Sequence, residues 1–193
     1  EMMEAFFETE KWIGSDPTQY APNIYFVNHA TPLVPVTVVG RRFRDAIDDL
    51  EIRFGELDET VLIPLPAEAQ PAPGTDGELA VINVDTGEEW GVINGQVGAD
   101  GTWTAGGLYR YHIGNSGVPP AGFAQRGAGI GSFAGIVRPC EVERGFIGHA
   151  VTLAYDYPCT PEVCRANGWP EVIPPFTKTD GLGTLQYDIP EGA

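Results

Sequence analysis

The sequence predicts an all-β fold, and three observations support this prediction. Gly (25) and Pro (17) supply 42 of the 193 residues, too many for a chain built mainly of helices. Hydrophobic residues make up 42% of the chain, which is enough for a packed core and argues against disorder. Short alternating apolar runs recur between turn residues. We therefore expect one β-sandwich or jelly-roll-like domain over residues 21–193, preceded by an N-terminal arm over residues 1–20.

The first expected element is amphipathic. Met2 and Phe6 are four positions apart, as are Met3 and Phe7, which predicts a short helix or a docking arm. Strands are then expected over residues 23–30, 33–39, 50–54 and 60–65. Pro35, in the second of these strands, favours a sheet edge or a bulge over a central strand. A proline-rich surface loop over residues 66–77 follows.

The later elements begin with a hairpin. Residues 78–84 and 89–94 are predicted to pair across the intervening turn, and further strands are expected over 101–105 and 108–113. Residues 114–135 are glycine-rich and aperiodic, as in a functional loop. A short helix near 139–145 is predicted from Pro139 at its first turn and Gly145 at its end. Residues 147–155 alternate, which predicts a strand with His149 on its apolar face.

The net charge limits the partners. There are 11 Lys and Arg residues against 27 Asp and Glu residues, a formal charge of −16. Binding to nucleic acid depends on cations that neutralise phosphates, and the largest basic cluster is Arg41, Arg42 and Arg44. No apolar run approaches the roughly 18 residues of a membrane span. We expect no nucleic acid partner and no membrane insertion, which leaves cations, neutral sugars and proteins, including copies of this chain bound through residues 1–20.

The three cysteines favour an oxidising, extracellular setting. Cys159 and Cys164 lie five positions apart in a proline-containing loop, where a local disulfide closes easily. Two free thiols and a metal site are the alternatives, although no further Cys or His lies nearby to complete a metal site. Cys140 is then left over, either buried or paired with another chain. The sequence begins at Glu1, which is expected of a processed or trimmed product.

Carboxylates are the first candidates for chemistry. Glycoside hydrolysis uses two carboxyl groups across a cleft, one protonated and one ionised. Glu89 is the leading candidate because it adjoins Trp90, and an aromatic wall raises a carboxyl pKa. Glu141 and Asp85 are the other candidates for the pair, and His149 is the candidate for an orienting or proton-handling group. A solvated acidic surface is the alternative explanation for any one of these acids.

The aromatic residues are candidates for a sugar platform. Flat sugar faces stack on exposed rings, and the candidates for substrate binding are Trp90, Trp103, Tyr109 and Tyr111. Core packing is the alternative explanation for rings on strands.

Cofactors are not expected. Metal catalysis commonly uses two or three histidines in one site, and the chain has only His29, His112 and His149. Acidic turns at Asp76, Asp85 and Asp100 are candidates for Ca²⁺. The glycine-rich loop lacks the Gly-Lys-Ser/Thr sequence and the strand–loop–helix context of a nucleotide site. Close packing of its backbone over a sheet is the simpler explanation for so many small residues.

The second half of the chain carries a recognisable pattern, A-G-L-[IV]-R-P-x-E-[IL]-x-x-G-x-I-x-H-A, which is matched at Gly135, Arg138, Pro139, Glu141, Gly145, Ile147, His149 and Ala150. On this pattern, the chain from roughly Pro66 to Ala193 resembles an uncharacterised family of secreted bacterial β-sandwich proteins. This chain has Glu78 or Leu79 where the family usually has a histidine, and members continue beyond the sequence IPEGA. Secretion, and the occasional presence of carbohydrate-binding modules in members, imply work on polysaccharide.

Three functions follow as hypotheses. The first is a secreted polysaccharide-active protein, with hydrolysis by a carboxylate pair. The second is a structural subunit of an extracellular filament or sheath that docks through its N-terminal arm. The third is a non-catalytic carbohydrate-binding module, which needs the aromatic rings but not the acids.

Overall fold

The computed structural model describes residues 18–117, 119–120, 122–123, 125, 129–149, 151, 165–166, 176–179 and 185–187. Strands dominate these residues, which confirms the all-β class, whereas the sandwich or jelly-roll topology stays a prediction. The predicted short helix is α2 (Pro139–Arg144), which ends at Gly145 in the left-handed conformation with φ 66°. Of the predicted arm, only residues 18–20 are described, and Cys159 and Cys164 lie outside the described residues.

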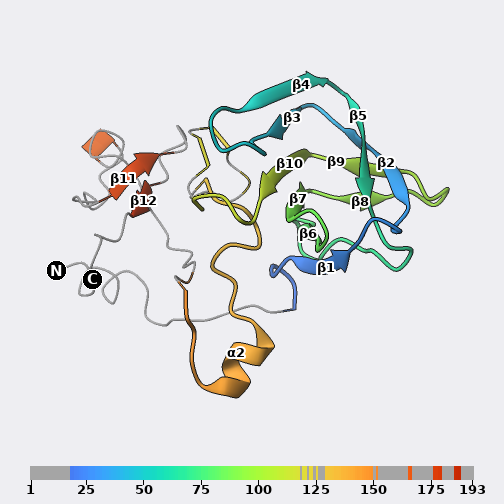
Figure 1. The fold of residues 1–193 in the computed structure, drawn as a ribbon. Coiled ribbons are helices and arrows are strands. Elements are labelled where there is room, and N and C mark those ends of the chain that lie inside the picture. The colour runs from blue at the N-terminus through green and yellow to red at the C-terminus, as the bar shows by residue number, and fades with distance from the viewer. Residues whose placement is uncertain are drawn as a thin grey trace.

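The larger sheet has six strands in the order β1-β6-β7-β10-β3-β4 (Figure 1). Their bounds are β1 (Asn23–Val27), β3 (Arg42–Asp45), β4 (Arg53–Leu57), β6 (Leu79–Asn83), β7 (Glu88–Ile93) and β10 (Gly107–His112). The predicted hairpin is the antiparallel pair β6 and β7. Two other pairs, β1 with β6 and β3 with β10, are parallel, so the sheet is mixed.

The smaller sheet has four strands in the order β5-β2-β9-β8. Their bounds are β2 (Leu33–Val38), β5 (Thr60–Pro64), β8 (Gln96–Val97) and β9 (Trp103–Ala105). Gly106 alone separates β9 from β10, so the chain passes there from the smaller sheet to the larger one. A separate antiparallel pair consists of β11 (Phe176–Thr179) and β12 (Leu185–Tyr187).

The position of Pro35 corrects the expectation of an edge strand. β2 lies between β5 and β9, yet its pairing with β9 begins only at Val36, opposite Trp103. At Pro35 the strand therefore has a paired neighbour on the β5 side alone, where Leu62 lies opposite. Proline lacks a backbone N–H, so a local edge of this kind accommodates it inside a central strand.

Other boundaries also differ from the sequence predictions. β4 begins three residues later than expected, and the short strands β3 and β8 were not predicted. Charged residues at Arg42, Arg44 and Asp45 hide the strand pattern of β3, and β8 has only two residues. A strand was expected over residues 147–155, but residues 147–149 and 151, the described part of this range, are not in a strand.

One hydrophobic cluster joins the two sheets. The larger sheet contributes the buried side chains of Val27, Leu79, Val81, Trp90, Val92 and Leu108. The smaller sheet contributes Val36, Val38, Ile63, Trp103 and Ala105. Burial of this apolar surface is the main stabilising term for a fold of short strands.

The glycine-rich loop covers the other face of the larger sheet. Along β10, Tyr109 and Tyr111 alternate with Leu108 and therefore point away from the shared core. Phe123 packs against both tyrosines, with ring centroids 5.5 Å apart in each pair. The described part of the loop is thus a cover over the sheet, the packing role that its small residues favour.

Replacing Gly91 with alanine should destabilise this cover. A Cβ atom at Gly91 would overlap the side-chain amide of Gln125, which is 2% exposed and hydrogen-bonded within the loop. We expect Gly91→Ala to lower the free energy of unfolding by about 1–3 kcal/mol, the usual cost of overpacking. Urea denaturation measures the difference.

The matched control is the Gln125→Ala substitution, alone and combined with Gly91→Ala. Truncating Gln125 removes the overlap. The loss of unfolding free energy in the double variant should therefore be much smaller than the sum of the losses in the two single variants. Additive losses would contradict the proposed contact.

Candidate functional site

Glu89 lies near the middle of the larger sheet, beneath the glycine-rich loop. The residue is 2% exposed. Its Oε1 atom accepts hydrogen bonds from the Phe133 backbone N–H at 3.0 Å and from Gln125 Nε2 at 3.4 Å. The strand register places Glu89 opposite Ile82 and Tyr111. The carboxylate is therefore an acceptor that holds the loop on the sheet.

The loop supplies two further buried polar residues to this cluster. Gln125 Nε2 donates to Ser132 Oγ at 2.6 Å, and Ser132 is fully buried. A Cβ atom at Gly131 would lie 2.7 Å from Glu89 Oε2, so a glycine there permits the close approach. The buried Oε1 atom of Gln125 has no hydrogen-bond partner among the described residues. Glu89, Gln125 and Ser132 form a closed contact between loop and sheet, not an open cleft.

Glu141 and His149, two of the candidates selected from the sequence, lie side by side. His149 Nε2 is 3.0 Å from Glu141 Oε1, and Arg138 Nη1 is 3.1 Å from the same oxygen. The Arg138 backbone N–H donates to Glu141 Oε2 at 2.8 Å. This backbone donor, with His149 and the Arg138 guanidinium, holds the pKa of Glu141 below its usual value despite partial desolvation. Glu141 is therefore ionised at neutral pH and suits a base or nucleophile, not a proton donor.

The two candidate carboxylates are connected through Phe133. Its backbone N–H binds Glu89, and its ring lies 4.9 Å from the guanidinium carbon of Arg138, which pairs with Glu141. The ring also meets Phe26 edge to face at 6.1 Å. Glu89 and Glu141 therefore lie on the two sides of the Phe133–Arg138 contact.

The four predicted platform aromatics are packed inside the protein. Trp90 is 6% exposed, Trp103 9%, Tyr109 1% and Tyr111 4%. The two tryptophans belong to the core between the sheets, and the two tyrosines lie under the loop. Burial raises the pKa of Tyr111 to about 12, and its hydroxyl donates to Asp49 Oδ1 at 2.8 Å. In this structure none of the four presents an open ring face to a sugar.

Arg110 was not identified as important from the sequence. Its Nε atom lies 3.0 Å from Asp45 Oδ1 and its Nη2 atom 2.7 Å from Oδ2, which is a bidentate pair across β10 and β3. The guanidinium also lies 3.4 Å from Glu88 and 5.3 Å from the centroid of the Trp90 ring. These contacts join three strands, so the role of Arg110 is structural. Its place between two tyrosines was the only sequence signal.

A second unexpected pair lies at the surface. His29 Nδ1 is 2.6 Å from Asp85 Oδ2, and the His29 side chain is 86% exposed. The backbone N–H of His29 is the main cause that lowers the pKa of Asp85, followed by the imidazole. The pair connects the turn after β1 with the turn after β6.

Two of the three acidic turns proposed for Ca²⁺, those at Asp85 and Asp100, use their carboxylate oxygens in internal hydrogen bonds. Asp100 Oδ1 accepts from the Thr102 hydroxyl at 2.7 Å and from the Thr102 N–H at 3.1 Å, and these bonds lower the pKa of Asp100. Within the described part of the chain, no group of three or more His, Cys, Asp or Glu side chains could hold a metal ion. Cys140 is a free, exposed thiol.

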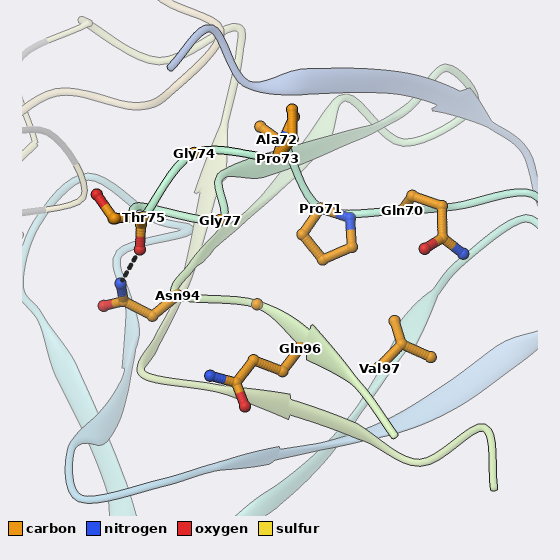
Figure 2. A pocket seen from close by; sticks show the side chains of 11 residues that line it. Gln70, Pro71, Ala72, Pro73, Gly74, Thr75, Gly77, Asn94, Gln96 and Val97 are labelled. Carbon is orange, nitrogen blue, oxygen red and sulfur yellow. Dashed lines mark hydrogen bonds between the residues drawn. The ribbon is translucent and has the colours of Figure 1, made fainter. Parts of the chain in front are cut away.

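A polar groove of about 520 Å³ opens beside the smaller sheet (Figure 2). It lies between the proline-rich loop and the β7–β8 connection, and it is lined by residues 70–75, Gly77 and residues 94–97. This volume lies within the usual range of small-molecule sites. No lining residue is charged, although the chain carries a net charge of −16. The lining combines proline rings with the amides of Gln70, Asn94 and Gln96.

The walls of the groove are held by hydrogen bonds. Asn94 Nδ2 donates to the Thr75 carbonyl at 3.0 Å, as Figure 2 shows. On the other side, the Gln70 N–H donates to the Tyr25 hydroxyl at 3.0 Å, and Asn23 Nδ2 donates to the Gln70 carbonyl at 2.9 Å. These bonds fix the loop backbone and leave the exposed side-chain amides of Gln70 and Gln96 unpaired among the described residues. The groove is preformed.

Comparison of the chain with known protein families, curated proteins and solved structures finds no match. Among the described residues, no helix is long and apolar enough to cross a membrane.

The Glu141 cluster should respond to acid. The pKa of Glu141 is lowered in the folded protein, so the carboxylate stabilises its surroundings above the ordinary glutamate pKa of about 4.3, and this stabilisation is lost as the pH falls through the lowered value. We expect the Gly145 and Phe146 amides, which bond to the last turn of α2, to lose protection as acid is added, where protection is the exchange rate compared with that of an unstructured peptide at the same pH. Hydrogen exchange measured by NMR tests this expectation.

Glu141→Gln is the control for this measurement. It keeps the side-chain shape but removes the titrating group, so protection of these amides should lose its acid dependence between neutral pH and pH 3. An unchanged acid profile in Glu141→Gln would show that another group controls this segment.

Proposed function

We propose that this protein is a secreted, extracellular polysaccharide-active protein that binds a neutral polysaccharide in the groove between residues 70–77 and 94–97. The observation that carries the proposal is the neutral lining of a preformed groove in a strongly acidic chain. The resemblance to a family of secreted bacterial proteins supports the same setting. We also keep the β-sandwich topology as a proposal, supported by the core that the two sheets share.

The chemistry of the lining favours sugar over the other neutral ligands. Side-chain amides both donate and accept hydrogen bonds, as the hydroxyl groups of a sugar require. Pro71 and Pro73 add apolar ring surface for the C–H faces of a sugar. An anionic polymer would meet the repulsion of the acidic protein without a cation in the lining to offset it.

Truncating the free amides should weaken binding. We expect Gln70→Ala and Gln96→Ala each to weaken the binding of a neutral polysaccharide about fivefold or more, because each removes hydrogen bonds to the ligand. Affinity electrophoresis through gels that contain glucan, mannan, xylan or galactan measures this effect, and alginate serves as an anionic comparison.

Asn28→Ala is the matched control, since it truncates an exposed amide in the turn after β1, outside the groove. If none of the neutral polysaccharides slows the migration of the wild-type protein, the proposal is overturned. Retardation by alginate alone would overturn it as well.

Hydrolysis is a second candidate function, favoured by the pairing of Glu141 with His149. An ionised Glu141 would act as base or nucleophile, and the buried Glu89 would act as the acid. A substrate would have to displace the loop residues that cover Glu89. Catalysis therefore requires a movement that binding in the groove does not.

The two carboxylates can be tested separately from the groove. If the protein is a hydrolase, Glu89→Gln and Glu141→Gln should each reduce the release of reducing ends from the bound polysaccharide by at least about 100-fold. Binding in the gels should stay unchanged in both variants. Equal activity in wild type and variants would exclude this pair, and an inactive wild type that still binds would leave a carbohydrate-binding module.

The filament or sheath subunit depends on docking through residues 1–20, of which only residues 18–20 are described. It stays a prediction and does not involve the groove.

A further inference from the structure

The four strands of the smaller sheet contain no charged residue, which is unusual in a chain with 27 acidic side chains. Their outward positions are nevertheless open to solvent: Leu33 is 61% exposed and Leu62 55%, and Pro35 between them is also exposed. Surface strands normally carry charges that prevent association. An exposed, uncharged sheet face therefore indicates a surface that meets a partner.

A row of polar side chains crosses this face at right angles to the strands. Thr60 pairs with Thr37, Thr37 with Thr104, and Thr104 with Gln96, so the four residues occupy directly opposed positions on β5, β2, β9 and β8. Opposed residues point to the same side of a sheet. The hydroxyl groups of Thr37 and Thr60 lie 2.9 Å apart, and Thr104 and Gln96 have no side-chain partner among the described residues.

The row leads from one hollow to another. Gln96, at one end, also lines the neutral groove. Thr37 lines a second hollow of about 230 Å³, between β2 and the turn that precedes β9. The other lining residues are Val34, Pro35, Asp100, Gly101, Thr102 and Trp103, so the one charge beside the row is Asp100, in the turn and outside the strands. This second hollow lies where β9 has not yet begun to pair with β2.

We infer that the ligand is an extended neutral polysaccharide that lies across the strands of the smaller sheet, from the groove at Gln96 along the row to Thr37 and Thr60. This inference rests on the proposed function and adds the shape of the ligand and its path. Four neighbouring strands span about 14 Å, so the row presents polar groups at a spacing of about 4.8 Å to a chain longer than one sugar. Leu62 and Pro35, beside the row, supply apolar contact for the C–H faces of the same chain.

The test compares ligands of different length. Oligosaccharides of the neutral polymer selected by the gels, from disaccharide to long chains, are titrated calorimetrically against wild type and Thr37→Val/Thr104→Val. Valine keeps the shape of threonine and suits a strand, so the double variant should fold. We expect it to bind long chains about tenfold more weakly, through the loss of hydrogen bonds along the row, and to bind disaccharides with unchanged affinity.

Thr31→Val removes a threonine hydroxyl outside the row, in the turn after β1, where it accepts a hydrogen bond from the Asn28 N–H. This variant should bind long chains as wild type does. If the double variant binds long chains with unchanged affinity while Gln96→Ala binds them more weakly, the path along the row is overturned but the proposed function stands. No binding by wild type would overturn both.

The alternative occupant of this face is a second copy of the chain. Light scattering of wild type and Thr104→Lys at several protein concentrations would detect such a dimer. A dimer that Thr104→Lys dissociates would overturn the inference, because the face would then be an interface between protein copies. If wild type and Thr104→Lys are both monomers and Thr104→Lys no longer binds long chains, the inference is supported.

Discussion

The alternation of side chains along β7 is the constraint on which the rest of the structure depends. Trp90 and Val92 point into the core shared with the smaller sheet, whereas Glu89 and Gly91 point toward the glycine-rich loop. A shift of one residue would place the carboxylate in the apolar core and the indole beneath the loop. The larger sheet can be covered on both faces because β7 presents apolar side chains to the shared core and a hydrogen-bonding carboxylate to the glycine-rich loop.

The two sheets divide the chemistry between them. The larger sheet holds the buried acid and the bidentate pair of Arg110 with Asp45, and these charges connect strands and loop. Charged groups in such partly buried sites need partners, so they are poorly available to a ligand. The smaller sheet carries no charge, and its outer face and groove stay open. The candidate site for a neutral polymer is therefore on the sheet that the structure does not need to tie together with ion pairs.

Much of the fold could be predicted from local patterns. The β6–β7 hairpin follows from alternation on both sides of a turn that contains Gly87, and the end of α2 follows from Gly145. Glu141 and His149 were both selected from the sequence for their chemistry, but the contact between them was found only in the structure. The groove was missed because its lining consists of prolines, glycines and amides, which resemble an ordinary surface loop. The lack of charge in the strands of the smaller sheet was the signal that could have revealed this face.

The sequence by itself determined the all-β class and the main turns, because composition and periodicity act locally or over the whole chain. Only the tertiary structure decided which strands are neighbours, including the parallel pairs β1–β6 and β2–β9. It also decided that Trp90, Trp103, Tyr109 and Tyr111 are packing residues, and that Thr37, Thr104 and Gln96 form one row. Alternation shows that a residue faces one side of a strand, but which side is buried depends on partners distant in the chain.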